Sequence, residues 1–177
     1  MKHKTFVIIC IIAAVILIWL CMYLKMNHIV PEPVEDEYVQ GEEIRYYGLK
    51  IVPGDMEIYT NAGMQEMYGK IDDFDDDPKA VYVVVNLHVI NESGCDVNIE
   101  EGINAWIMSI GYFSNGQCCN LRSMNHKNPY AKDAETDLKL FYRFADGVYK
   151  GNAETVRKSS VKVYFSYYPE TRYIKYQ

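Results

Sequence analysis

The chain has 177 residues, of which 49% are hydrophobic and 16 are tyrosines, a composition that excludes intrinsic disorder and allows one domain of ordinary size. Its formal net charge is −6, but Lys2, Lys4 and Lys25 are the only basic residues before residue 26, so the remainder carries 15 basic and 24 acidic residues. That excess of negative charge excludes nucleic acid and anionic lipid headgroups as partners of the main domain.

An apolar run without charged residues fills residues 6–24, FVIICIIAAVILIWLCMYL. As a helix it would be roughly 28 Å long, close to the thickness of the hydrocarbon core of a bilayer. Two lysines precede the run and acidic residues follow from Glu32 onward, so the positive-inside rule places the N-terminus in the cytoplasm. We therefore expect a signal-anchor transmembrane helix in residues 1–25 of a single-pass cell-membrane protein whose C-terminal domain is extracellular.

Two alternatives to an uncleaved anchor stay open. A cleaved signal peptide requires small residues at the cleavage site, and residues 24–31 (LKMNHIVP) offer none. A lipidated cysteine at Cys21 would follow Trp19 and Leu20, whereas lipoprotein signals carry small residues before the cysteine. The sequence favours the anchor over both.

Residues 26–43 separate the apolar run from the rest of the chain. They contain two prolines and six acidic residues, which is typical of a solvated linker. We expect the folded domain to occupy residues 44–177.

Alternation of apolar and polar residues with a period of two dominates that domain and predicts β-strands. The clearest strands are expected at Val81–Val89, Trp106–Tyr112, Leu138–Phe144 and Val161–Tyr167. Weaker patterns occur at Ile44–Val52, Met56–Thr60, Cys95–Ile99, Gln117–Leu121 and Thr171–Tyr176. Short helices are expected at Ala62–Tyr68 and Ala153–Arg157.

Turn residues punctuate these runs. Turns are expected at Pro53-Gly54-Asp55, Asn91–Gly94, Asn115-Gly116 and Asp146-Gly147, and Asn115-Gly116 predicts a β-hairpin. Asn91-Glu92-Ser93 is also formally a glycosylation sequon, although the sequence favours a turn there. Together the elements predict an all-β protein with an antiparallel sandwich of about 7–9 strands, preceded by one transmembrane helix.

One segment order resembles a known family. The strand-like VYVVVNLHVINESGCDVNI, the stretch NPYAKDAETDLKLFYRF and the closing VKVYFSYYPETRYIKY occur in the order of the telokin-like, immunoglobulin-fold domains of uncharacterised Gram-positive bacterial surface proteins and lipoproteins. Ala134-Glu135 stands where that family has a Pro-Gly type of turn, and Cys95 has no counterpart. The resemblance implies an immunoglobulin-like fold and an extracytoplasmic location, and it implies no activity.

Aspartates crowd residues 72–77 (DDFDDD) and raise the hypothesis of a Ca²⁺ site. A loop with EF-hand spacing would use Asp73, Asp75 and Asp77 as ligands. Pro78 and Val84 then occupy the positions that require glycine and glutamate, so that motif fails. A solvated acidic loop is the alternative.

Three cysteines fall in the domain, Cys95, Cys118 and Cys119. Outside the cell Cys95 could form a disulfide with Cys118 or Cys119, or all three could remain free thiols. No additional residues complete a zinc site, and no organised base marks a catalytic thiol.

No catalytic residues, cofactor site or phosphate-binding loop can be identified in the sequence, so we expect no enzyme and no cofactor. Tyrosines recur in the predicted strands, where they either fill the sheets or form a contact surface. The sequence favours a membrane-anchored immunoglobulin-like module that binds a protein or cell-envelope partner. An accessory subunit of a membrane complex and an envelope hydrolase are the alternatives.

Overall fold

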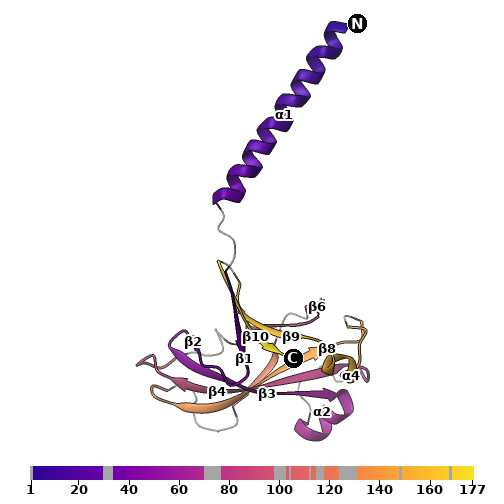
Figure 1. Cartoon of the computed structure of the whole chain (residues 1–177). Helices are drawn as coiled ribbons and strands as arrows, with labels where there is room; N and C mark the ends of the chain where they lie inside the picture. Colours follow the sequence, from indigo (N-terminus) through magenta and orange to yellow (C-terminus); the bar gives the residue numbers. More distant parts are fainter. Residues whose placement is uncertain are drawn as a thin grey trace. The chain divides into compact units, whose positions relative to one another are not determined.

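A computed structural model describes residues 2–29, 34–69, 77–97, 103, 105–111, 113–114, 118–123, 131–147, 149–167 and 169–177 (Figure 1). Side chains are described for these residues except 2–10, 27–29, 113–114 and 118–123. The chain divides into two compact units, Met1–Val34 and Glu35–Gln177, and each is described by itself.

The first unit contains one continuous helix, α1 (Lys2–Ile29). It lacks glycine and proline, and it ends shortly before Pro31, which cannot continue a helix. The side chains of residues 11–26 are all exposed. Within the part of the chain that is described, no helix is both long enough and apolar enough to cross a membrane. The transmembrane helix expected in residues 1–25 therefore stays a prediction.

The second unit is built on two five-stranded sheets. The first, here called the β3 sheet, has the order β2 (Ile44–Tyr46), β3 (Leu49–Thr60), β4 (Val81–Asn91), β8 (Glu135–Phe144), β7 (Cys118–Ser123). The second, the β9 sheet, has the order β1 (Val34–Val39), β10 (Glu170–Tyr176), β9 (Val161–Ser166), β5 (Ile107–Ile110), β6 (Phe113–Ser114). The strand pairs whose register is established are antiparallel.

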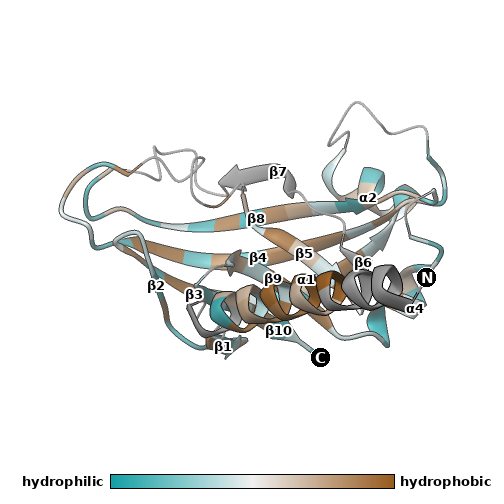
Figure 2. Ribbon diagram, turned by 90° about the horizontal axis from the view of Figure 1, so that it is seen from above, coloured by the Kyte–Doolittle hydropathy of each residue, from teal (hydrophilic) through white to brown (hydrophobic). Residues whose placement is uncertain are grey.

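The inner faces of the two sheets share one hydrophobic core, which makes the domain a β-sandwich (Figure 2). The alternation read from the sequence is confirmed, because the predicted inward side chains are buried. They are Val81, Val83, Val85, Leu87 and Val89 from β4, Leu138, Leu140, Tyr142 and Phe144 from β8, and Met108, Ile110, Val161, Val163 and Phe165 from the other sheet.

Both short helices form where the sequence predicts them. Helix α2 (Asn61–Tyr68) begins at the N-cap Thr60, whose side chain accepts a hydrogen bond from the Gly63 amide. It covers part of the outer face of the β3 sheet through a second cluster made of Met64, Ala80, Tyr82, Val84 and Phe141. Helix α4 (Ala153–Arg157) adds Ala153 and Val156 to the main core.

The linker predicted at residues 26–43 is wrong in its second half, because residues 34–39 form β1 beside β10. Its acidic side chains meet basic partners on β10. Glu37 contacts Lys175 at 3.0 Å and Asp36 contacts Arg172 at 3.3 Å. A run whose sequence is typical of a solvated linker is therefore an edge strand, with ion pairs to β10 and with Tyr38 packed against the core.

The strand predicted at Ile44–Val52 is in fact a hairpin. Tyr47 and Gly48 turn the chain between β2 and β3 with φ angles of 50° and 77°. Conversely, the turn predicted at Pro53-Gly54-Asp55 is a bulge inside the continuous strand β3. A β-carbon at Gly54 would lie 3.3 Å from that of Asn86, so a small residue suits the close approach of β4.

The hairpin predicted at Asn115-Gly116 is also wrong. The strands on either side of it, β6 and β7, belong to different sheets. The two turn residues lie outside the described ranges. Residues 95–97 of the strand expected at Cys95–Ile99 have no strand conformation, and the remainder of that run is not described.

Candidate functional site

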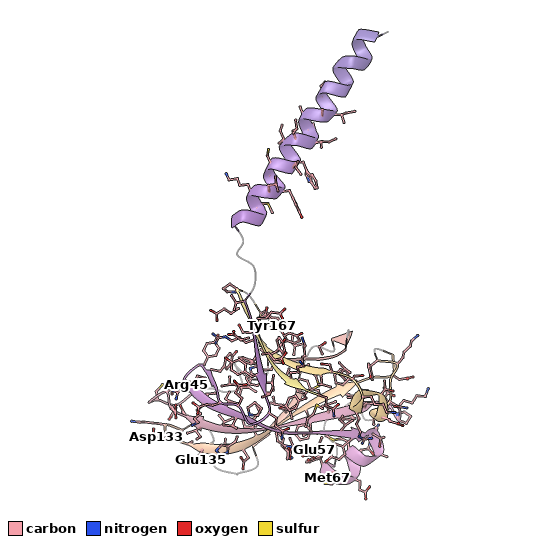
Figure 3. The ribbon with its side chains drawn as sticks, in the orientation of Figure 1. Arg45, Glu57, Met67, Asp133, Glu135 and Tyr167 are labelled. Carbon is pink, nitrogen blue, oxygen red and sulfur yellow. The ribbon has the colours of Figure 1, made fainter. Side chains whose placement is uncertain are left out.

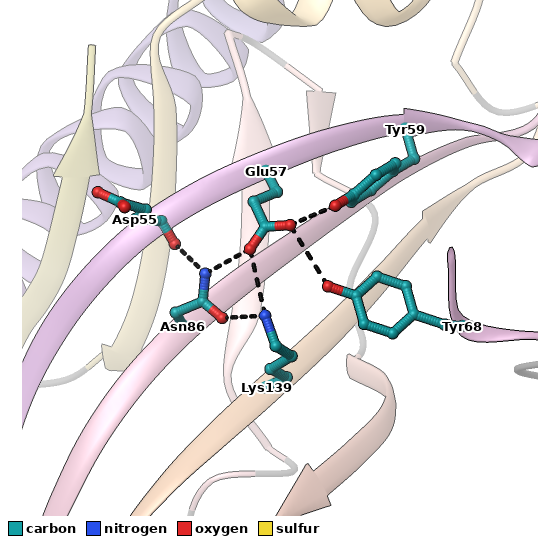
Figure 4. Close-up of polar contacts among 6 residues, drawn as sticks. All are labelled: Asp55, Glu57, Tyr59, Tyr68, Asn86 and Lys139. Carbon is teal, nitrogen blue, oxygen red and sulfur yellow. Dashed lines mark hydrogen bonds and ion pairs between the residues drawn. The ribbon is translucent and has the colours of Figure 1, made fainter. Parts of the chain in front are cut away.

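A polar cluster lies on the outer face of the β3 sheet, centred on the carboxylate of Glu57 (Figure 4). Asn86 Nδ2 donates to Glu57 Oε1 at 2.8 Å, and Lys139 Nζ lies 3.2 Å from the same oxygen. The hydroxyls of Tyr59 and Tyr68 donate to Glu57 Oε2. The carboxylate therefore has four donors, from β3, β4, β8 and α2.

Burial and hydrogen bonding act in opposite directions on Glu57. Burial alone would raise its pKa, but the hydrogen bonds from Tyr59, Asn86 and Lys139 outweigh that effect and lower the pKa to about 2. Burial lowers the pKa of Lys139, yet its bonds to Tyr68 and Glu57 leave it raised overall. Both groups therefore remain charged near neutral pH.

This pattern suits a structural connection better than catalysis. A general acid or base needs a pKa near the working pH, whereas Glu57 is held far below it. Four donors also occupy the lone-pair positions of the carboxylate. We interpret the Glu57 cluster as the contact that fixes α2 to three strands.

A pocket of about 600 Å³ adjoins this cluster. It opens where β3 runs beyond its pairing with β2 and faces the ends of β1 and β10. We call it the edge pocket; it is lined by Val39, Gln40, Asp55, Met56, Glu57, Lys175, Tyr176 and Gln177. Its volume lies within the range typical of small-molecule sites.

Charged groups in the edge pocket already have partners. Lys175 Nζ contacts Glu37 at 3.0 Å, and Glu57 is held as described above. Gln40 Nε2 donates to Asp55 Oδ1 at 2.5 Å. Tyr176 is only 4% exposed, and its buried hydroxyl has no hydrogen-bond partner among the described residues.

Loops gather at one end of the sandwich, which we call the loop end and define as residues 45–48, 91–97 and 131–134. The Glu92 amide donates to the Gly48 carbonyl at 3.0 Å, and the Lys132 amide donates to Asp96 Oδ1 at 2.9 Å. Figure 3 shows Arg45 and Asp133 on this side of the domain.

Tyr47 is the most exposed large hydrophobic residue of the domain among the described residues, at 75%. Its φ of 50° lies in the left-handed region, which bulky residues rarely adopt. Behind it Tyr46 makes an edge contact with Tyr47, the ring centroids lying 4.5 Å apart, and Tyr46 packs against Trp106 and Phe165. Packed aromatic side chains therefore support the exposed ring of Tyr47.

Asn91 organises the same end from inside. It is 1% exposed, and its Nδ2 donates to the carbonyls of Cys95 at 2.8 Å and Ala131 at 3.0 Å. Its Oδ1 accepts from the amide and hydroxyl of Ser93. The turn expected at Asn91–Gly94 is confirmed. Asn91, the asparagine of the sequon, connects this turn to Ala131 through its side-chain hydrogen bonds.

The Ca²⁺ hypothesis stays a prediction, because Asp73 and Asp75 lie outside the described residues. Asp77 accepts hydrogen bonds from the amides of Lys79 at 3.1 Å and Asp146 at 3.0 Å. The Asp146 amide is the largest cause of a lowered pKa for Asp77. The described role of Asp77 is therefore to connect two turns.

Metal ligands do not converge elsewhere in the described part of the chain. His88 has carboxylates on both sides, with Glu135 3.1 Å from Nε2 and Asp137 2.8 Å from Nδ1. Because these two nitrogens lie on different edges of the ring, the three side chains do not face a common point. His88 is a surface residue whose side chain is 39% exposed.

Of the two states that the sequence left open for Cys95, a disulfide with Cys118 or Cys119 and a free thiol, the structure has the free thiol. Cys95 is a free, exposed thiol beside Asn91. Cys118 is paired with Tyr142, which is itself paired with Val83, eight residues along β4 from Asn91. That offset corresponds to about 26 Å, whereas disulfides need α-carbons within about 7 Å.

Sequence reasoning did not single out Glu57 or Lys139. The only local signal was that Glu57 and Lys139 occupy polar positions of alternating strands. Their meeting depends on the register of β3, β4 and β8, which local patterns do not encode.

No family model matches the chain. A search of curated proteins finds no match either. Among solved structures, the chain is similar to the crystal structure of an uncharacterized β-sandwich protein from Clostridium difficile 630. The TM-score is 0.49 and the sequence identity is 12%, with 83% of this chain and 97% of that chain covered. The strand pairing and the shared core described above establish the β-sandwich.

Proposed function

We propose that this protein is a membrane-anchored, extracytoplasmic immunoglobulin-like module that binds a protein or cell-envelope partner through its loop end. The observation that carries the binding role is Tyr47, an aromatic side chain 75% exposed on a turn that disfavours it. Tyrosine is enriched among the residues that dominate binding energies. Unfavourable backbone conformations persist where function requires them.

Strand order supports the immunoglobulin-like assignment. The series β3-β4-β8-β7 and β5-β9-β10 follows the order A-B-E-D and C-F-G of immunoglobulin domains. Trp106, fully buried immediately before β5, lies where those domains carry a core tryptophan. The B and F equivalents, β4 and β9, contain no cysteine, which departs from antibody domains. The proposal retains the resemblance to the telokin-like domains of bacterial surface proteins that the order of segments suggests.

This correspondence also supports the choice of the loop end. The connection from β4 to β5 corresponds to the B–C connection, and in antibody variable domains that loop contributes to the binding site. Residues 92–97 of this connection contact the Tyr47 hairpin through the Glu92 amide and the Arg45–Glu92 ion pair. An aromatic tip on mutually bonded loops suits recognition of a partner with little ordering cost.

The anchor is supported by the sequence of α1. Its uncharged run of residues 6–24 has the length of a bilayer core, and Trp19 stacks on Tyr23 with centroids 5.6 Å apart near the C-terminal end of that run. Alkaline carbonate extraction of membranes tests it. We expect the full chain to remain in the pellet, and release into the supernatant would refute anchoring.

Site-specific photocrosslinking in intact membranes tests the binding role. A photoreactive phenylalanine analogue replaces Tyr47, and a matched probe replaces Met67, which is 62% exposed on α2. We expect a discrete crosslinked product from position 47 and none from position 67. Equal products from both positions, or none from 47, would contradict a partner at the loop end.

A further inference from the structure

A second binding site, separate from the loop end, follows from the edge pocket. We propose that the edge pocket binds a neutral, hydroxyl-rich ligand of the size of a mono- or disaccharide. It lies beside the bulge of β3, on the side of the sandwich that β2 leaves uncovered. A volume of about 600 Å³ accommodates such a ligand.

The polar groups of the pocket suit hydroxyl groups, which both donate and accept hydrogen bonds. Asp55 offers an acceptor, Gln40 offers an amide, and Tyr176 offers a phenol. Val39 and Met56 add apolar surface for the carbon faces of a ring. Mixed donors and acceptors beside apolar patches are what a saccharide requires.

Charge balance argues against an ionic ligand. Two charged groups of the pocket already form ion pairs, Lys175 with Glu37 and Glu57 with Lys139. An anion would approach the carboxylates of Asp55 and Glu57, and a cation would approach Lys175. An added anion would be buried without a free positive charge, and a ligand hydroxyl can bond to Asp55, whose partner is the neutral Gln40 amide, without adding charge, so we argue for a neutral ligand.

Tyr176 supplies an independent observation. Its hydroxyl is buried, lacks a hydrogen-bond partner among the described residues, and belongs to a residue that lines the pocket. Buried polar groups are nearly always paired in folded proteins, so an exception needs an explanation. A ligand hydroxyl would provide the missing partner. Burial also raises the pKa of Tyr176, which keeps the phenol protonated and able to donate.

Nitrogen-15 NMR of the full chain in phosphocholine micelles, which contain no sugar, tests the proposal. The probes are glucose, N-acetylglucosamine and N,N′-diacetylchitobiose at millimolar concentrations, with n-butylamine and acetate as charged probes. We expect at least one saccharide to shift amide signals at residues 39–40, 55–57 and 175–177. Shifts elsewhere, no shifts with any saccharide, or shifts with only a charged probe would overturn the proposal.

The variant Tyr176→Phe separates a ligand contact from a packing role. We expect it to keep or raise the melting temperature and to weaken saccharide binding by about tenfold, as loss of one buried hydrogen bond predicts. Asp137→Asn is the matched surface control and should leave saccharide binding unchanged. Unchanged affinity in Tyr176→Phe would refute the role of the hydroxyl. Crosslinking from Tyr47 is unaffected by either result, so the two proposals fail independently.

Discussion

Lys139 on β8 and Glu57 on β3 meet across the intervening strand β4, with Lys139 Nζ 3.2 Å from Glu57 Oε1. Asn86 of β4 lies between them and bonds to both. Three strands are thus joined by side chains as well as by backbone. This contact makes the stability of the β3 sheet depend on pH.

The domain should lose stability as the pH falls from about 4.5 toward 2. Since the folded-state pKa of Glu57 is about 2, below its ordinary 4.5, its contribution is complete above the ordinary value and is lost as the carboxylate is protonated. Allowing for its partial exposure, we expect the share of Glu57 to be about 1–2 kcal/mol. Urea unfolding at a series of pH values measures it.

The variant Glu57→Gln isolates this effect from other carboxylates whose pKa is lowered, such as Asp77 and Glu43. It should be less stable than the parent at neutral pH by about 2 kcal/mol, because Lys139 loses its charged partner. Its free energy of unfolding should then vary less with pH below 5. Parallel pH profiles for parent and variant would show that Glu57 does not contribute.

Replacing Asn91 by alanine should be strongly destabilising. The change removes the Asn91 donor from the carbonyls of Cys95 and Ala131 and removes the acceptor of the Ser93 amide. We expect a loss of about 3 kcal/mol, since several buried hydrogen bonds disappear together. Ser93→Ala, which removes one hydroxyl, should cost about 1 kcal/mol. Chemical unfolding compares the two, and equal small effects would contradict the role of Asn91.

Tyr47→Asn should stabilise the domain while weakening partner capture. Asparagine tolerates a φ of 50° better than tyrosine, and Asn-Gly is the preferred sequence for this kind of hairpin turn. We expect a gain of about 0.5 kcal/mol after the loss of the contact with Tyr46. Thermal melts and the crosslinking assay, with the probe moved to Arg45, measure the two effects. A variant that binds normally would remove Tyr47 from the interface.

Gly48→Ala should act in the opposite direction on the same turn. A β-carbon there would lie 2.6 Å from the Ser93 β-carbon, and the φ of 77° disfavours side chains. We expect a loss of about 2 kcal/mol. Gly94→Ala, with a φ of 78° but no atom near the added carbon, is the matched control and should cost less. Equal losses would show that only backbone strain matters.

Cys95 should react with iodoacetamide in the native protein without prior reduction. It is exposed and unpaired, so mass spectrometry should find it fully alkylated under oxidising conditions. The variant Cys95→Ser should unfold within about 0.5 kcal/mol of the parent. A reductant-dependent linkage from Cys95 to Cys118 or Cys119 would contradict the strand register.

Much of the fold could be predicted from local patterns. Alternation of apolar residues along β4, β8 and β9 is a property of neighbouring positions, and the same positions line the core. Helix α2 could also be predicted because it lies within one short segment of the sequence. Errors arose where distant segments decide the structure: β1 lies beside β10, which supplies Arg172 and Lys175 as ion-pair partners, and its Tyr38 packs against the core.

The candidate sites were harder to predict than the fold. Glu57 and Lys139 are 82 residues apart, and only the register of three strands brings them together. The turn at Tyr47-Gly48 was missed because tyrosine is unusual in the left-handed region. The edge pocket combines residues from β1, β3 and β10, so no continuous segment of the sequence could indicate it.

The engaged amide of Asn91 has a kinetic consequence. Glycosylation needs a free side-chain nitrogen, and both hydrogens of this one are directed to carbonyls inside the folded domain. If the chain is expressed through a eukaryotic secretory pathway, a glycan can be attached only before the loops close. The fraction of glycosylated molecules would then report on the folding rate of the domain. It would rise in variants whose sandwich assembles slowly.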